Sequence, residues 1–176
     1  GMLHMDVFRQ RLWDEHRQSV IITNPSVTYR CIMKDGEVKY IDNPVDAPDP
    51  LYVKQWEEAI CTTTIMTPRD YFEDVNTLCM NKRGQEISQE FLEEQVILKY
   101  EIPLSEMIGD FFDVLKSITS GYASLEYKFK EFSPTEISKV VFHLNGEAID
   151  ALTFLVNKDK ARNFATYYAA KLKDIL

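Results

Sequence analysis

Two short segments carry residue types that could contact a nucleic acid. One is Lys82-Arg83-Gly84, with two cations before a glycine, and the other is Ser120-Gly121-Tyr122, with a hydroxyl and an aromatic ring around a glycine. Cations bind phosphate oxygens, whereas hydroxyls, free backbone N–H groups and aromatic rings contact phosphates and unpaired bases. The alternative is that both segments simply end helices. A net charge of −8 also opposes nucleic-acid binding by this chain alone.

The remaining titratable residues do not form a catalytic or metal-binding set. His4 and His16 are twelve positions apart, and His143 lies in the middle of an expected strand. The acidic pairs Glu57-Glu58 and Glu93-Glu94 are adjacent in sequence, so on a strand their side chains point to opposite faces. We expect these carboxylates to be solvated edge residues. The sequence therefore predicts no catalytic residue and no metal ligand.

Glycine and cysteine spacing excludes further chemistry. The six glycines form neither a dinucleotide-binding G-x-G-x-x-G motif nor a P-loop, so any nucleotide chemistry must lie outside this chain. No cofactor is predicted within it. The three cysteines, Cys31, Cys61 and Cys79, include no C-x-x-C pair and are odd in number. We expect reduced thiols that pack as small apolar core residues.

Length and composition indicate a folded chain. With 176 residues, of which 45% are hydrophobic, we expect one or two compact units, each with its own core. Apolar runs such as Val140–Leu144 are far shorter than the roughly 18–20 residues that a membrane-spanning helix requires. The sequence therefore predicts no transmembrane helix.

The middle of the chain predicts an α+β, ferredoxin-like module. Alternating or apolar runs predict strands at 59–66, 86–92, 95–102 and 122–132, and helical periodicity predicts two helices between them. For the first helix, Thr67 is the expected N-cap, Pro68 the first helical residue and Gly84 the end. The second helix is expected from Pro103 to Ser120-Gly121. The order β-α-β-β-α-β is the split βαβ pattern, a four-stranded antiparallel sheet with two helices on one face.

The flanking segments predict smaller elements. Before the module we expect a helix at 3–17 and strands at 19–23, 27–33 and 38–41, with an irregular proline-rich linker at 43–50. Lys34–Glu37 and Asn145-Gly146 are predicted type I′ turns, because Asp-Gly and Asn-Gly readily adopt positive φ angles. After the module we expect strands at 136–144 and 148–156, followed by a helix at 158–176.

The predicted topology also indicates where the two candidate segments lie relative to each other. We expect the C-terminal ends of both helices of the module to emerge on the same edge of the sheet. Lys82, Arg83 and the Ser120–Tyr122 loop would then be neighbours and would form a single RNA-contact edge.

Taken together, the motifs resemble the elongation factor 4 family, of the LepA type. Colinear matches to family motifs cover essentially the whole chain, and they include Gly1–Asp6, Pro25–Tyr29, Lys82–Gly84, Pro103–Ile108, Asp110–Asp113, Ser120–Tyr127, Leu144–Glu147 and Asp150–Leu152. The middle module is similar, more distantly, to the fifth domain of elongation factor G. The resemblance implies a fragment with three parts: the end of domain III at 1–50, a domain V-like module at 51–133, and the start of the family-specific C-terminal domain at 134–176.

The resemblance further implies a ribosome-binding segment of a translational GTPase that acts on the translocation state of the tRNAs. GTP and Mg²⁺ would bind, and GTP would be hydrolysed, in a domain upstream of this chain. Partners would be rRNA, ribosomal proteins and tRNA, with membrane association of the parent protein possible and the segment itself monomeric. The rRNA-facing residues would be Lys82, Arg83, Ser120, Gly121 and Tyr122.

Departures from the family pattern favour one branch of it. Asp6-Val7-Phe8 and Ile118-Thr119-Ser120 lean toward the mitochondrial branch, which implies the mitochondrial matrix or the inner membrane face. The bacterial cytoplasm is the alternative. Two other function classes stay open from the residues alone: a ferredoxin-like module that binds a small regulatory molecule, and a metal- or thiol-dependent enzyme.

Overall fold

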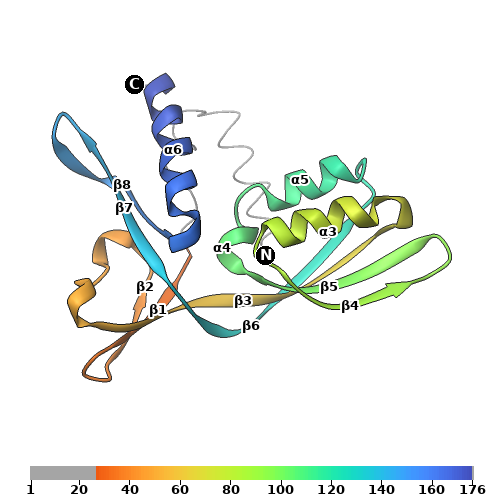
Figure 1. The fold of residues 1–176 in the computed structure, drawn as a ribbon, viewed down its shortest axis with the longest axis horizontal. Helices are drawn as coiled ribbons and strands as arrows, with labels where there is room; N and C mark the ends of the chain where they lie inside the picture. The colour runs from red at the N-terminus through yellow and green to blue at the C-terminus, as the bar shows by residue number, and fades with distance from the viewer. Residues whose placement is uncertain (1–26, 176) are drawn as a thin grey trace. The chain divides into compact units, whose positions relative to one another are not determined.

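A computed structural model of the chain describes residues 27–175, and the helix and strand expected at 3–17 and 19–23 lie outside them. The described residues divide into two compact units. One combines the residues up to Glu57 with those from Pro134 onward, and the other is Glu58–Ser133 (Figure 1). The division into three domains at 50 and 133 stays a prediction.

The second unit has the predicted ferredoxin-like topology. Its sheet has the order β6-β3-β5-β4, and β5 pairs antiparallel with both β3 and β4. Helices α3 and α5 lie on the same face of this sheet (Figure 1). The α+β, split βαβ prediction is thus confirmed. The elements are β3 (Val53–Pro68), α3 (Phe72–Asn81), β4 (Gln85–Phe91), β5 (Gln95–Pro103), α4 (Leu104–Met107), α5 (Phe111–Ile118) and β6 (Ser124–Thr135).

The core of this unit lies between the sheet and the two helices. Every second residue of β5 is fully buried, and the helices add Val75, Phe111 and Leu115 at helical spacing. Burial of each such side chain stabilises the fold by about 1.5–3 kcal/mol. The two sequence periods of 2 and 3.6 residues therefore converge on one apolar layer.

The first helix of the module begins later than predicted. Thr67 and Pro68 remain in β3, paired with Val96 and Gln95, so Thr67 is not an N-cap. A 3₁₀ turn, Arg69–Tyr71, follows, and α3 begins at Phe72 without a side-chain cap. The capping prediction was wrong because cross-strand pairing extends β3 through the residues that carried the capping signal.

The second predicted helix is two helices. The apolar stripe continues through Met107 and Phe111, but α4 ends at Met107 and α5 starts only at Phe111. A hydrophobic pattern at helical spacing does not detect such an interruption, because the buried side chains still face the core on both sides of it.

Gly84 acts differently from the predicted helix-ending glycine. The residue with positive φ after α3 is Arg83, at 57°. At Gly84 a Cβ atom would lie 2.7 Å from the carbonyl oxygen of Cys79 and 3.3 Å from Cγ1 of Ile102. The glycine is therefore required by its close approach to the backbone carbonyl of Cys79 and to the Ile102 side chain.

The first unit contains two hairpins and the C-terminal helix. β1 (Tyr29–Met33) pairs antiparallel with β2 (Val38–Ile41), and β1 is also the neighbour of β3, whose first residues belong to this unit. β7 (Ile137–Leu144) pairs antiparallel with β8 (Glu147–Asn157), and α6 (Lys158–Ile175) follows. The linker at 43–50 contains the 3₁₀ turn Pro44–Asp46 and leads into a second one, Pro50–Tyr52.

The two predicted type I′ turns have different outcomes. Asn145 and Gly146 have φ angles of 54° and 82°, as such a turn requires. In the β1–β2 turn only Gly36 has a positive φ, so the prediction was wrong there. The reason is local: the Asp35 carboxylate accepts the N–H of Glu37 at 2.8 Å and stabilises a different turn.

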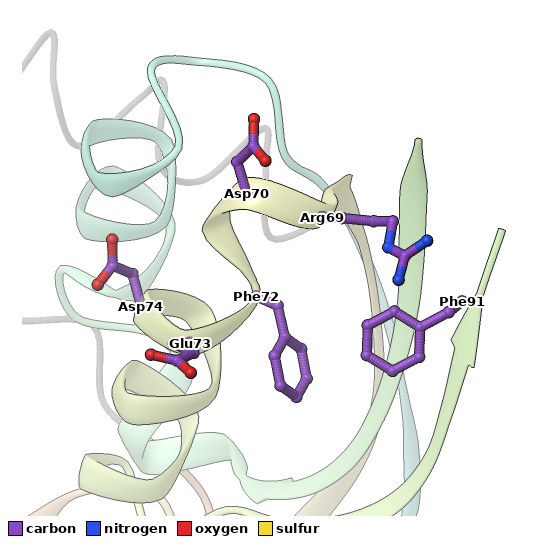
Figure 2. Close-up of a pocket in the computed structure, with 6 residues that line it drawn as sticks. All are labelled: Arg69, Asp70, Phe72, Glu73, Asp74 and Phe91. Atoms are coloured by element: carbon purple, nitrogen blue, oxygen red, sulfur yellow. The ribbon is translucent and has the colours of Figure 1, made fainter. Parts of the chain in front are cut away.

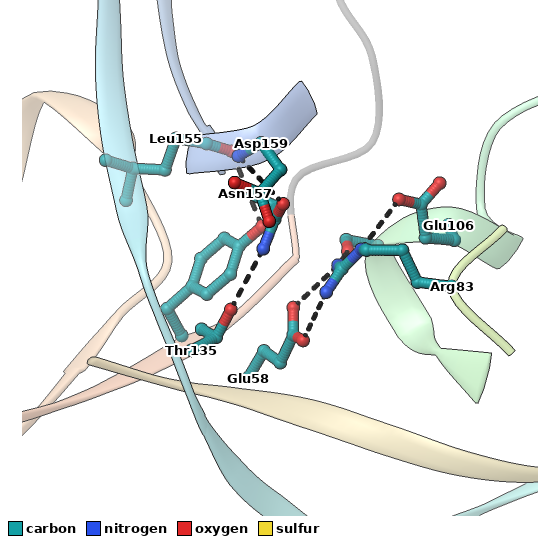
Figure 3. A network of polar contacts seen from close by, with 9 residues as sticks. Glu58, Arg83, Glu106, Thr135, Leu155, Asn157 and Asp159 are labelled. Carbon is teal, nitrogen blue, oxygen red and sulfur yellow. Dashed lines mark hydrogen bonds and ion pairs between the residues drawn. The ribbon is translucent and has the colours of Figure 1, made fainter. Parts of the chain in front are cut away.

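Helix α6 is anchored at its start and along one face. Asn157 donates its side-chain N–H to Thr135 at 3.2 Å and accepts the N–H of Asp159 at 3.1 Å (Figure 3). The rings of Phe164 and Phe154 pack edge to face at 5.1 Å. The asparagine therefore satisfies a backbone N–H that the first helical turn leaves unpaired.

All three thiols are buried, and this gives a first prediction. Burial raises the pKa of the Cys61 thiol to about 11 and that of the Cys79 thiol to about 12, and it also raises the pKa of Cys31. We expect no thiol to react rapidly with a disulfide reagent at pH 8 in the native chain, because the reactive thiolate is scarce and inaccessible. In denaturant all three should react at once. One rapidly reacting thiol in the native chain would contradict the buried positions.

Candidate nucleic-acid interface

The two candidate segments lie at opposite ends of the helical layer. The Tyr71 hydroxyl, just before α3, donates to Ser120 Oγ, just after α5, at 3.2 Å. At the other end, the Lys82 ammonium after α3 lies 3.0 Å from the carboxylate of Asp110, just before α5. Each helix thus ends beside the start of the other (Figure 1).

The predicted single edge is therefore wrong. Because β3 and β5 are antiparallel, the helices that follow them run in opposite directions. Ten-residue α3 is about 15 Å long at 1.5 Å per residue, which separates Lys82 and Arg83 from the Ser120–Tyr122 loop. The candidate interface consists of two separate sites.

The first site is the turn after α3. The backbone N–H of Lys82 bonds the carbonyls of Leu78 and Cys79 at 3.1 and 3.2 Å, which fixes the residue at the helix end. Its ammonium is paired with Asp110, whose side chain is 67% exposed. The Lys82 side chain is 23% exposed, so the pair is open to water mainly on its Asp110 side, and its net energy is about 1 kcal/mol or less. A phosphate can therefore compete with Asp110 for the ammonium.

Arg83 is held within its own unit. Its guanidinium donates two hydrogen bonds to Glu58, at 2.8 and 2.9 Å, and a third to Glu106 at 3.0 Å (Figure 3). Burial acts to lower the pKa of Arg83, but the hydrogen bonds and charges of the two carboxylates outweigh it and hold the pKa above its usual value. The Glu58 side chain is 6% exposed and buried, that of Glu106 is partly buried at 14%, and that of Arg83 is 23% exposed. The guanidinium therefore links Glu58 on β3 to Glu106 on α4 and fixes the turn between α3 and β4 that contains Arg83.

The network also corrects the prediction for the acidic pair. Glu58 and Glu57 are buried, and each accepts a hydrogen bond from an arginine, Arg83 and Arg30 respectively. The prediction that these two carboxylates are solvated edge residues was therefore wrong. The two side chains do not converge, however, because each binds a different arginine. Sequence analysis missed Glu58 because a buried carboxylate on a strand looks like an exposed one until its partner is known.

The second site is the loop after α5. Ser120 and Gly121 both have positive φ, at 52° and 82°. The N–H of Gly121 bonds the carbonyl of Lys116 at 2.7 Å, and the N–H of Tyr122 bonds that of Thr119 at 2.9 Å. These bonds satisfy the last carbonyls of the helix and reverse the chain sharply into β6.

Two side chains support the loop from within. The Thr119 hydroxyl, fully buried, donates to the carbonyl of Leu115 at 2.8 Å and accepts the N–H of Ala123 at 3.1 Å. The Lys116 ammonium donates to the carbonyl of Gly121 at 3.2 Å and to that of Ala123. The Tyr122 side chain projects from this support and is 69% exposed.

A shallow pocket of about 400 Å³ lies at the start of α3 (Figure 2). Its aromatic wall is the edge-to-face pair Phe72 and Phe91, with the Arg69 guanidinium 5.1 Å from the centre of the Phe91 ring. Three carboxylates complete the lining, those of Asp70, Glu73 and Asp74. This mostly acidic lining offers poor binding for a phosphate.

Residues 27–175 contain no group of three or more His, Cys, Asp or Glu side chains that could hold a metal ion. No helix among them is long and apolar enough to cross a membrane.

Comparison with known proteins assigns the chain. It is 42% identical to elongation factor 4 of Anoxybacillus flavithermus over 177 aligned residues, which cover all of this chain and 29% of that protein. Elongation factor 4 of Geobacillus thermodenitrificans matches with the same identity and coverage. The chain belongs to the elongation factor 4 family. It spans less than a third of the length of these relatives.

A second comparison agrees with the fold. Residues 55–140 match the family described as elongation factor G C-terminus. The resemblance inferred from the motifs is thus confirmed, as is the relation of the middle module to elongation factor G. Both elongation factor 4 relatives are bacterial proteins, so they lend no support to the mitochondrial branch.

Proposed function

We propose that this chain is the ribosome-binding C-terminal part of a translational GTPase that acts on the translocation state of the tRNAs, including back-translocation. The observation that carries the proposal is the identity to elongation factor 4, which extends over the whole chain. The test is cosedimentation of the chain with purified bacterial ribosomes. We expect saturable binding that weakens as salt rises; absence of binding at low salt would overturn the proposal.

The proposed rRNA contacts are two separate sites. Lys82 supplies a cation at the end of α3, and Ser120, Gly121 and Tyr122 supply the loop after α5. Arg83, which we predicted as a contact, contributes by holding the turn that presents Lys82, because its guanidinium is bound to Glu58 and Glu106.

Lys82 gives the sharpest test of the first site. We expect Lys82→Gln to weaken ribosome binding and to reduce the slope of log K against log salt by about 1, because one phosphate contact is lost. Asp110→Asn should have the opposite effect on affinity, since it removes the carboxylate that competes for the ammonium. Binding is measured by cosedimentation between about 50 and 200 mM salt.

Lys34→Gln is the matched control, because Lys34 is an exposed lysine in the β1–β2 turn. It should leave both affinity and slope unchanged. Equal effects of Lys34→Gln and Lys82→Gln would point to non-specific charge attraction and remove the proposed contact.

The activity and location of the parent protein belong to the same proposal. GTP and Mg²⁺ would bind in a GTP-hydrolysing domain encoded upstream of Gly1, which a P-loop in the preceding codons would reveal. Ribosomal proteins and tRNA are the further partners, and we expect the segment itself to be monomeric. The proposed compartment is the mitochondrial matrix or inner membrane face, where the parent would associate with the membrane, and the alternative is the bacterial cytoplasm.

A regulatory module that binds a small molecule is the second candidate, and the pocket beside Phe72 and Phe91 is the observation that favours it. Its three carboxylates would select a cationic ligand. A melting-temperature screen of the chain against polyamines and basic amino acids tests this candidate. A shift that Asp74→Asn abolishes would support it, and unchanged melting temperatures would exclude it.

A further inference from the structure

We propose that Tyr122 is a stacking platform for an unpaired nucleobase, and that Lys116 is the positioning residue that holds this platform in place. The inference rests on the proposed ribosome contact and deepens it. It names the chemical class of the ligand at the loop after α5 and separates that class from phosphate binding.

The first step concerns the direction of the Tyr122 side chain. Two consecutive residues with positive φ, Ser120 and Gly121, precede it, and Ser120 is a residue that rarely adopts that conformation. The loop is fixed by hydrogen bonds from its backbone and from the buried Thr119 hydroxyl. Backbone strain of this kind persists only where the surroundings enforce it. The tyrosine is therefore presented by a rigid support, which lowers the entropic cost of binding.

The second step concerns what the ring contacts. Among residues 27–175 we find no hydrogen bond, ring contact or cation for the Tyr122 side chain, although it is 69% exposed. Its neighbours Ser120, Gly121 and Ser124 are exposed and polar, and Ala123 is buried. The Tyr71 hydroxyl bonds Ser120 beside it, but Tyr122 is the exposed large apolar side chain of the Thr119–Ala123 loop, so the loop does not present the contiguous apolar patch that a protein partner requires. A single flat base fits it better, since every base offers a π face.

The third step concerns the nearest cation. The Lys116 ammonium is directed to the carbonyls of Gly121 and Ala123 and lies 5.7 Å from the centre of the Phe112 ring. Since it is engaged by the loop, it serves to hold the carbonyls on either side of Tyr122. The platform therefore contributes stacking, whereas Lys82 at the other end of the helical layer contributes charge.

The experiment compares the wild-type chain with Tyr122→Phe, Tyr122→Leu and Tyr122→Ala on purified bacterial ribosomes. Loss of one stacked base weakens binding by about 5- to 150-fold. We expect this loss for the alanine and leucine variants with an unchanged salt slope, and binding within about twofold of wild type for phenylalanine. Chemical probing of the rRNA should show one unpaired base that wild type protects and Tyr122→Ala does not.

Lys116 is tested by its own pair of variants. Lys116→Met should speed hydrogen exchange of the loop amides and weaken binding without changing the salt slope, because no phosphate contact is lost. Lys116→Arg keeps N–H donors at this position, so it should restore much of the slow amide exchange and much of the ribosome binding. A reduced salt slope for Lys116→Met would make this lysine a phosphate contact and overturn its positioning role.

The remaining outcomes separate the inference from the proposed function. If wild type binds ribosomes and Tyr122→Ala binds equally well, the stacking inference fails and the proposed function stands. If Tyr122→Leu matches wild type, the ring contacts an apolar protein surface and the inference is again overturned. If the wild-type chain does not bind, the proposed function itself fails. Tyr52→Ala is the matched control, because Tyr52 is similarly exposed in the other unit.

Discussion

Replacing Arg83 with methionine is expected to lower the free energy of unfolding by about 3–5 kcal/mol. The change leaves Glu58 and Glu106 without their cation, and their side chains are only 6% and 14% exposed. Two neighbouring carboxylates would then share a site with little water, which penalises the folded state. Urea unfolding followed by circular dichroism measures the effect.

A triple variant isolates the cause. Combining Arg83→Met with Glu58→Gln and Glu106→Gln should recover much of the lost stability, because the uncompensated charges are gone. Lys130→Met is the matched control, since it breaks an ion pair with Glu101 in the same unit but at a more exposed position. An Arg83→Met cost as small as that of Lys130→Met would show that the network does not stabilise the fold.

The Gly84→Ala variant should lose about 3 kcal/mol of stability, the upper end of the range for inserting a methyl group into a packed interior. The added Cβ would lie 2.7 Å from the carbonyl oxygen of Cys79, which also accepts the Gly84 N–H at 2.9 Å. Because the opposing atom belongs to the backbone, it cannot rotate away, and the helix end must shift from β5. Thermal unfolding and urea titration both report the loss.

Gly109→Ala is the control for Gly84. A Cβ at Gly109 would meet no atom within 4 Å, and the residue does not have a positive φ. We expect its stability to stay within about 0.5 kcal/mol of wild type. If both alanine variants lost the same stability, the effect would reflect glycine flexibility, and the close approach at Gly84 would not be its cause.

Much of the fold could be predicted because it depends on local periodicity. The alternation along β5 and the apolar stripe through Phe111 and Leu115 identify the buried face of each element, even when the elements that pack against it are unknown. The Asn145-Gly146 turn could be predicted because the required φ angles are a property of those two residues. The family could also be identified from the sequence, because many short motifs occur along the chain in the same order as in the family.

Element ends were less predictable, because tertiary contacts decide them. Thr67 carries a capping signal, yet pairing with Val96 extends the strand through it. Gly84 was predicted as a helix end for its conformational freedom, but the approach of Cys79 and Ile102 sets its role. At Thr67 a strand partner far away in sequence overrides the local preference, whereas at Gly84 the nearby helix end and Ile102 of β5 together set the role of the residue.

For the candidate interface, too, some features could be predicted from the sequence and others could not. Residue type and family motif were enough to select the Lys82-Arg83 pair and the Ser120–Tyr122 loop as candidate contacts. Their placement at opposite ends of the antiparallel helices, and the binding of Arg83 by Glu58 and Glu106, became known only from the folded chain. Charge and side-chain type are local properties of the chain. Strand direction and the partner of a buried charge depend on residues far away in sequence.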